Sequence, residues 1–557
     1  MRDDIVGGFG SIAYIAAAAG ALLFAIALAN AASLLLTRAE GRRRELALRV
    51  VLGASTRRVV AQFMSESLLL GVLGGAAGLG IALLGVRQLV RAAPLGIPRA
   101  SEIAIHPASI AFAVVVTILM AFACSGIAAL RLDVRNLGVR LRENTRGGTA
   151  ARDRQRARRT LVVTQVAFAT VLVSGAAFLL QNAFRLGRAD PGFNASHSLT
   201  LWLSLPTITY PHDSDVVRFT SRVESRVSQI QGVAAVGVAS NIPLFGLGQT
   251  YTPVWSDADP GTSTTLPPSD LIVVASGGFF SSLGIPLLAG RTFYPAERQS
   301  AYEAIIDRSL ARAYWGDPTG ARAIGRRIRL TQDPKSDNWY TVIGVVGTVA
   351  DTSLAGPGVA ALYLPEVVPA DSNRSVVSRV MALTVRSTGD PRAIRPFVER
   401  AIADVDRSVP PFRVKPMSDV LRDSTARLWF MVVILATTAT IALLLAAIGL
   451  YGVLSFMVNA RSKEMSIRMA MGALPSTVVR LVTRQGAVLT GIGVVAGAVV
   501  FLVLVRYLES AVSGLSGPAM ATIVTAPVAL LCVTVLASWV PARRAARADP
   551  VRALSSD

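Results

Sequence analysis

The residues ELALRVVLGASTRRVV at 45–60 occur a second time as EMSIRMAMGALPSTVV at 464–479. A constant offset of 419 positions aligns the two stretches and continues beyond them. The pairs that keep their residue type include Glu45 and Glu464, Arg49 and Arg468, Gly53 and Gly472, Gly78 and Gly497, and Arg87 and Arg506. Similarity at one fixed offset indicates an internal duplication. The apolar segments around these stretches are duplicated with them, over residues 11–130 and again over 428–540.

Those apolar segments are long enough to cross a membrane. Apolar residues make up 52% of the 557 residues, charged residues only 16%, and the mean hydropathy is +0.51. A soluble domain carries roughly a quarter charged residues, and a membrane helix needs about 20 mostly apolar ones. Seven segments qualify: 11–37, 67–90, 107–130, 161–181, 428–458, 487–508 and 521–540. The sequence therefore predicts an α-helical polytopic membrane protein with seven spans.

The arginines indicate which way the chain crosses. Arginine-rich loops follow the first, third, fifth and seventh spans, and the loops between them hold few basic residues. Because Lys and Arg favour the cytoplasmic side, we expect the N-terminus outside and the C-terminus in the cytoplasm. The net charge of +21 gathers beside the spans, which argues against nucleic acid as a partner.

One large domain is expected outside the cytoplasm, at residues 182–427. Residues 199–205 (LTLWLSL) alternate as a half-buried strand, and 215–230 have helical spacing in Val216, Phe219 and Val223. Further strands are predicted at 233–239, 271–275, 341–349 and 380–386, and a helix at 391–406. Residues 417–427 should form a helix that runs into the fifth span. This pattern predicts an α/β domain.

The duplication also defines the expected organisation. We assign a first three-span unit to 1–142, a basic cytoplasmic linker to 143–160, a span to 161–181, the α/β domain to 182–427, and a second three-span unit to 428–557. A span and a domain precede the second copy, but only ten residues precede the first. The duplication thus predicts a leading span and a first outside domain that this sequence lacks. The alternative is a protein of seven spans.

Several stretches resemble the MacB/FtsX superfamily of ABC transporter permeases, and the doubled arrangement is similar to its duplicated orphan permease (ADOP) branch. The most specific are the repeated stretch itself, IGLYGVLSFMV (448–458) and PARRAARADPVRAL (541–554). GGFFSSLGIPLLAGRTF (277–293) and VIGVVGTVAD (342–351) resemble the MacB-like periplasmic core, in which the family has a flanking and an inserted subdomain. The resemblance implies a bacterial inner membrane protein whose partner is a cytoplasmic ABC ATPase, with a periplasmic or outer-membrane protein as a further partner.

The repeated stretches suggest elements that couple to such an ATPase. Each reads as a short helix that a glycine closes, followed by a second helix with Pro475 at its first position in one copy. The hypothetical coupling residues are Glu45, Arg49, Gly53, Glu464, Arg468 and Gly472. The alternative is an interfacial helix whose arginines contact anionic lipid.

A few residues within the spans have polar or small side chains. We expect Asn30 and Gln165 to hydrogen-bond neighbouring helices, and the glycines at 71, 74, 75 and 78 to allow close helix packing. The two cysteines lie in apolar runs, and the three histidines are far apart in sequence, so no metal site is expected.

No catalytic or cofactor-binding residues are predicted. A G-x-x-x-x-G-K-[ST] motif does not occur in the sequence. The resemblance implies mechanical transmission, in which ATP-driven closure of a separate ATPase moves the periplasmic domain to export or extract a molecule. One alternative is an FtsX-like regulator of an envelope hydrolase or sensor. A secondary transporter is disfavoured because ionisable residues are missing from the span centres.

Overall fold

The computed structural model describes residues 2–41, 56–92, 105–132, 148–245, 249–258, 267, 269–300, 302–330, 339–351, 354, 359–367, 377–460, 471, 475–511, 517 and 520–546. The chain divides into two compact units. A helical unit comprises Met1–Phe184 and Arg427–Asp557, and an α/β unit comprises Arg185–Ala426.

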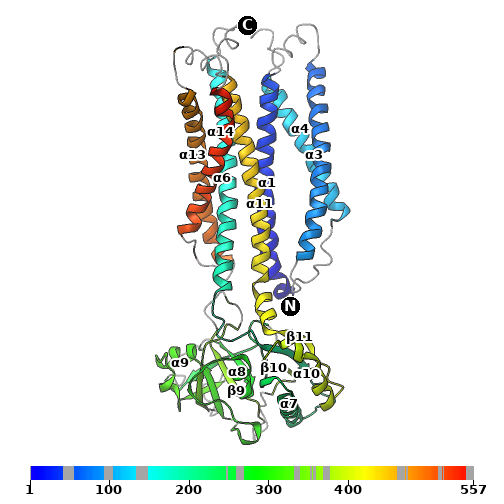
Figure 1. The fold of residues 1–557 in the computed structure, drawn as a ribbon, viewed down its shortest axis with the longest axis vertical. Coiled ribbons are helices and arrows are strands. Elements are labelled where there is room, and N and C mark those ends of the chain that lie inside the picture. Colours follow the sequence, from blue (N-terminus) through cyan, green and yellow to red (C-terminus); the bar gives the residue numbers. More distant parts are fainter. Residues whose placement is uncertain are drawn as a thin grey trace. The chain divides into compact units, whose positions relative to one another are not determined.

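Seven long helices run through the described part of the helical unit (Figure 1). They are α1 (Arg2–Gly41), α3 (Thr56–Ala92), α4 (Pro107–Leu132), α6 (Gly148–Gly187), α11 (Met417–Ala460), α13 (Pro475–Ala511) and α14 (Met520–Ala546). Each predicted span lies within one of them. By length and composition, five carry an apolar stretch able to cross a membrane, while α4 and α14 carry the shorter stretches Pro107–Leu119 and Thr522–Ala537 among the described residues. The predicted class of a helical membrane protein is confirmed, but the count of seven spans is not, since only five of the described helices are long and apolar enough.

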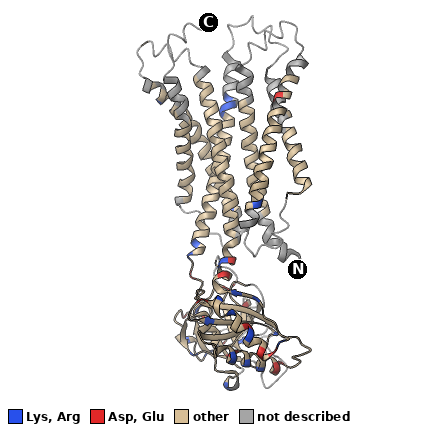
Figure 2. Cartoon of the chain, turned by 45° about the vertical axis from the view of Figure 1, so that its right-hand side comes forward, with Lys and Arg blue, Asp and Glu red and all other residues tan. Residues whose placement is uncertain are grey.

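The helices extend beyond their predicted spans, and the extensions of α6 and α11 bear on the predicted organisation. Helix α6 already begins at Gly148, so much of the stretch 143–160, expected as a linker, is helical. Its sequence GTAARDRQRARR is rich in Ala and Arg, which favour helices. Helix α11 begins at Met417 and is continuous into the fifth apolar segment, as predicted. Figure 2 shows few charged residues along the described parts of these helices and many over the α/β unit.

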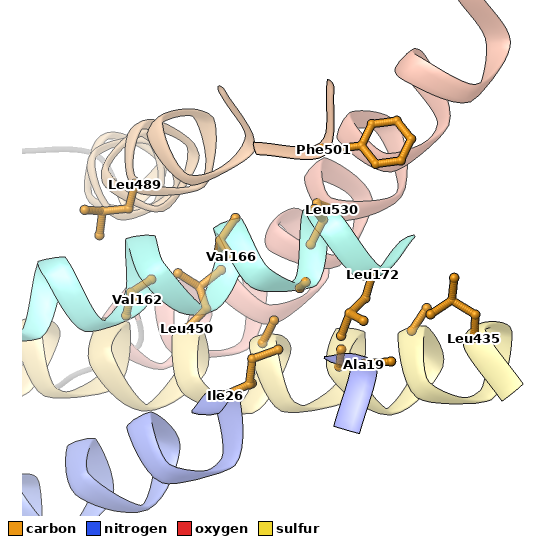
Figure 3. Close-up of a cluster of buried hydrophobic side chains, with 14 of the residues drawn as sticks. Ala19, Ile26, Val162, Val166, Leu172, Leu435, Leu450, Leu489, Phe501 and Leu530 are labelled. Atoms are coloured by element: carbon orange, nitrogen blue, oxygen red, sulfur yellow. The ribbon is translucent and has the colours of Figure 1, made fainter. Parts of the chain in front are cut away.

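The core of the helical unit lies between α6 and α11 (Figure 3). Helix α6 contributes Val162, Val166 and Leu172, and α11 contributes Leu435 and Leu450. The other helices add Ala19 and Ile26 from α1, Leu489 and Phe501 from α13, and Leu530 from α14. No described residue of α3 or α4 belongs to this cluster. Helix α1 of the first copy and helices α11, α13 and α14 of the second copy therefore share one hydrophobic core.

The α/β unit contains one mixed sheet with helices on its faces. Its elements are β1 (Ser198–Ser204), α7 (Asp213–Ser228), β2 (Val233–Ala239), β3 (Thr250–Ser256), β4 (Ser269–Ala275), α8 (Gly278–Leu283), β5 (Leu287–Gly290), β6 (Glu303–Asp307), α9 (Arg308–Trp315), β7 (Arg327–Leu330), β8 (Trp339–Val346), β9 (Ala361–Pro365), β10 (Val380–Ser387), α10 (Pro391–Val405) and β11 (Phe412–Pro416).

The strand order reveals an insertion. The order is β11-β1-β10-β2-β4-β3-β7-β8-β6-β9, with β5 on β8 and a second pairing of β4 with β9. Strand β10, late in the unit, pairs antiparallel with both β1 and β2. The segment from β3 to β9 is therefore inserted in the sequence between β2 and β10, forms the other end of the sheet and closes on itself through the β4–β9 pairing, as the inserted subdomain of the resemblance implies.

Strand β1 alternates as predicted, but both of its faces are buried. Leu201 and Leu203 pack in the core beneath α7 and α10. Trp202 points to a second core, where its ring lies 5.4 Å from that of Phe245. The expectation of a half-buried strand was wrong because α8 and the inserted segment cover the face that was assumed to be exposed.

Gly237 of β2 allows α8 to pack directly on the sheet. A Cβ atom at Gly237 would lie 2.2 Å from the backbone nitrogen of Phe279 and 2.5 Å from the carbonyl carbon of Gly278. Both neighbours are backbone atoms, so side-chain rotation could not relieve the overlap.

We therefore predict that Gly237→Ala destabilises the α/β unit by about 1–3 kcal/mol, the usual cost of overpacking. The measurement is the melting temperature of the full chain in detergent. Gly389→Ala is the matched control, because nothing lies within 4 Å of a Cβ there. Equal melting temperatures for both variants would contradict the packing argument.

Candidate functional site: the polar core of the helical unit

Asn30 links α1 to α11. It is only 4% exposed, and its Nδ2 donates a hydrogen bond to the carbonyl oxygen of Leu445 at 2.6 Å. A buried amide among apolar side chains is costly unless it is paired. The expectation that Asn30 bonds a neighbouring helix is confirmed.

Gly449, one turn after Leu445 on α11, lies against side chains of both α1 and α6. A Cβ atom there would lie 2.2 Å from Oδ1 of Asn30 and 2.4 Å from Oε1 of Gln165. Only glycine leaves room for two amide side chains against the α11 backbone. In a membrane, where helix association depends on close packing and interhelical hydrogen bonds, this contact fixes how the three helices meet.

Part of this polar group is unsatisfied. Asn30 Oδ1 and both amide heteroatoms of Gln165 are buried and have no hydrogen-bond partner within the described chain. The expected hydrogen bond from Gln165 to a neighbouring helix is thus not formed in this arrangement. Asn30 Oδ1 and Gln165 Oε1 both lie within 2.4 Å of the position that a Cβ of residue 449 would take. Rotating the Gln165 amide by half a turn would place its NH2 group there, so that a donor and an acceptor would lie beside the α11 backbone instead of two acceptors.

The contact joins equivalent positions of the two copies. The offset of 419 that aligns the repeats places Gly449 opposite Asn30, and Leu445 opposite Ile26. Ile26 is fully buried in the same core. Asn30 of α1 and Gly449 of α11 therefore meet as the same position of two helices would across a twofold axis. The two copies differ in that one has an amide side chain at this position and the other has a glycine.

Glycines also bring α13 close to α6. A Cβ at Gly493 would lie 2.7 Å from Cβ of Val166, and one at Gly497 would lie 2.5 Å from the carbonyl oxygen of Ala167. This Gly-x-x-x-Gly spacing is typical of tightly packed membrane helices. The closest approach of α13 to the core thus depends on two residues without side chains.

The first copy keeps this motif without the contact. Its equivalents are Gly74 and Gly78 of α3, and a Cβ at either would meet no described atom within 4 Å. Gly75 does approach α4, at 3.3 Å from Thr117. The predicted close packing of these glycines is confirmed for Gly75 only. None of the described side chains in Met64–Gln88 is buried.

Basic residues lie beside the core at the start of the α6 span. Arg158 is 6% exposed, and its guanidinium carbon lies 3.8 Å from the ring centroid of Phe456 on α11. A cavity of about 640 Å³ next to it is lined by Arg159 and Thr160 of α6 and Arg484 and Gln485 of α13, among others.

The six hypothetical coupling residues, Glu45, Arg49, Gly53, Glu464, Arg468 and Gly472, lie outside the described residues. The helices that follow them are described: α3 begins at Thr56, and α13 begins at Pro475. The prediction that Pro475 takes the first helical position is confirmed. Gly449 and Gly493 were not singled out from the sequence, although the run GIGVVAG (491–497) resembles the glycine spacing noted in the first copy.

Two family models match the chain. The model described as FtsX-like permease C-terminal matches residues 17–133 and 436–550, and the model described as MacB-like periplasmic core domain matches residues 160–401. The second FtsX match begins at 436, which is 419 residues after the start of the first at 17. This is the offset of the repeat.

Relatives among curated proteins are exporters by name. The "Macrolide export ATP-binding/permease protein MacB" of Wolinella succinogenes is 31% identical over 149 residues, 26% of this chain and 23% of that protein. The "Probable syringafactin export ATP-binding/permease protein SyfD" of Pseudomonas syringae pv. tomato is 27% identical over 294 residues, 51% of this chain and 41% of that protein. This chain thus spans less than half the length of these relatives.

A solved structure of the periplasmic region of MacB from Actinobacillus actinomycetemcomitans shares 12% identity and covers 42% of this chain and 94% of its own, with a TM-score of 0.27.

The contact at Gly449 gives a mutational prediction. Gly449→Ala should lower the melting temperature of the detergent-solubilised chain, because both amides must move out of the way. Gly452→Ala is the control on the same helix, since its Cβ would meet only Leu34 Cδ2, at an ordinary 3.5 Å. Adding Asn30→Ala should make Gly449→Ala less harmful than additivity predicts. Strict additivity would contradict a direct contact.

Proposed function

Because this chain belongs to the MacB-type ABC permeases, with two FtsX-like segments around a MacB-like periplasmic core domain, we propose that it couples ATP hydrolysis by a separate cytoplasmic ATPase to motion of its α/β unit. The motion would drive export of a molecule, or its extraction from the envelope. The relatives named above are called both ATP-binding and permease proteins. The 557 residues here contain no P-loop motif, so the ATPase would be supplied by another part or another chain.

Helix α11 is the observation that best supports this mechanism. It is continuous over Met417–Ala460. Met417 and Val420 are buried in the core of the α/β unit, while Leu450 and Leu454 are buried in the core of the helical unit. One helix is therefore anchored in two hydrophobic cores.

Ion pairs fix the first turns of α11 within the α/β unit. Asp419 accepts a 2.8 Å hydrogen bond from Arg392 of α10, and Asp423 accepts one of 2.9 Å from Lys415 at the end of β11. Half-exposed pairs of this kind contribute little to stability, but they hold the start of α11 against helix α10 and strand β11. A displacement of α11 along its axis would therefore be passed to the α/β unit.

The duplication suggests that one chain provides both halves of the membrane assembly. The two FtsX matches and the meeting of Asn30 with Gly449 support this. We accordingly place the chain in the duplicated orphan permease branch, as a protein whose α1 and α11 occupy equivalent positions.

The proposed orientation places the α/β unit in the periplasm and the C-terminus in the cytoplasm, on the basis of the arginine-rich loops. Alkaline phosphatase, which is active only in the periplasm, should be active when fused within residues 240–260 and inactive when fused at 150 or 550. Activity at 150 together with silence at 250 would reverse the orientation.

The proposed contacts with the ATPase involve the repeated stretches. Arg468→Glu and Arg49→Glu should each weaken co-purification with a co-expressed cognate ABC ATPase, because losing a charge-assisted hydrogen bond costs about 1.5–3 kcal/mol, or ten- to a hundredfold in affinity. Arg135→Glu is the control, a reversal in the basic run that follows α4. If both test variants insert correctly and bind the ATPase as the wild type does, the lipid-facing interpretation of these stretches is the better one.

A further inference from the structure

A cavity in the α/β unit lies where the two parts of the sheet meet. Its volume is about 520 Å³, within the range that holds drug-sized molecules. The walls come from α7, β2, the residue after β9 and the segment that follows β5. The lining residues used below are Glu224, Val236, Ser276, Phe293, Pro295 and Glu366.

Glu366 enters this cavity directly after β9. The side chain is 7% exposed, because β9 pairs with β4 up to Pro365. Its Oε1 accepts a hydrogen bond of 2.8 Å from the hydroxyl of Thr220 on α7. No described residue donates a hydrogen bond to Oε2. Oε2 is thus the part of this largely buried residue that is open to the cavity.

Glu224 of α7 holds the second carboxyl of the cavity in a fixed position. The hydroxyl of Ser276 donates to its Oε1. The same hydroxyl accepts the backbone N–H of Val238 at 3.0 Å, so the end of β4 and strand β2 both determine where the carboxyl lies.

The cavity has no counter-charge for these two carboxyls. None of its described lining residues is Lys, Arg or His. Burial raises the pKa of Glu224 to about 7. Burial, and then the charge of Glu224, raise the pKa of Glu366 well above its usual range. Carboxyls buried without a cation favour their protonated form, and a positively charged group beside them would favour the ionised form and be bound by it.

We propose that this cavity binds an organic cation, with an ammonium or amidinium group between Glu224 and Glu366 and an apolar body against Val236, Phe293 and Pro295. A metal ion fits less well, because no group of three or more His, Cys, Asp or Glu side chains that could hold one occurs in the described chain. A single ion would also leave most of 520 Å³ unfilled. The proposal goes beyond the coupling function and does not depend on it.

The test compares three ligands of one shape and different charge: 4-fluorobenzamidine, 4-fluorobenzamide and 4-fluorobenzoate. Binding to the full chain in lipid nanodiscs is measured from the broadening of the ligand fluorine signal, with protein-free nanodiscs as the blank. The cation should bind at least about tenfold more tightly than the neutral amide, as expected when a hydrogen bond to a charged group is gained. The anion should not bind.

Two isosteric variants and one control locate the site. Glu366→Gln and Glu224→Gln should each weaken binding of the cation by at least about tenfold, with little change in melting temperature, because glutamine has nearly the same size and burial already favours the uncharged carboxyl. Glu399→Gln on α10 should bind as the wild type does, because that carboxylate forms only an i,i+4 pair with Arg395.

The outcomes separate cleanly. Equal affinity of the wild type for the cation and the neutral amide overturns the proposal, as does undiminished binding in Glu366→Gln. Should a glutamine variant fail to fold, the comparison of ligands on the wild-type chain still decides. No ATPase is needed, so a failure of the coupling proposal would leave the result unaffected.

Discussion

The close approach of three helices at Gly449 is the constraint on which the helical unit depends. Lipid tails are as apolar as the side chains they touch, so burial of apolar surface drives helix association weakly in a membrane. Shape and hydrogen bonds must decide which helices meet. Asn30 and Gln165 can reach the α11 backbone only because position 449 has no side chain, and the apolar cluster of α1, α6 and α11 lies around that contact.

The α/β unit depends on a different balance. Its sheet is covered on both faces, so burial of apolar side chains such as Trp202 and Phe219 is the main stabilising term. The inserted strands from β3 to β9 close on themselves through the β4–β9 pairing, and their junction with the flanking part leaves the cavity lined by Glu224 and Glu366. A junction between two folded parts is a common place for a ligand site.

Sequence patterns predicted the elements with a strong period and the longer apolar runs, and missed several short strands. The apolar spans, β1, α7, β2, β10 and α10 follow directly from run length or spacing. Strands β6 and β9 were missed because they are short and buried on nearly all positions, so no alternation marks them. Asn30 drew notice as an amide in a span. Gly449 could not be predicted as its partner, because a single glycine in an apolar helix does not indicate a close contact until the neighbouring helices are known. Thr220 and Glu366 are 146 positions apart, and only the fold brings them together.

The pairing of Asn30 with Gly449 also bears on how this chain evolved. In a symmetric dimer of identical chains, a position that faces itself across the axis carries the same residue twice. Two asparagines there would compete for one space, and two glycines would leave the gap unfilled and the helices without their hydrogen bond. Once both copies are encoded in one gene, the two equivalent positions mutate independently. One copy can then carry a large side chain where the other carries a glycine. Such a pair of substitutions, once fixed, makes a return to separate identical subunits harder, because neither half packs against a copy of itself as well as it packs against the other.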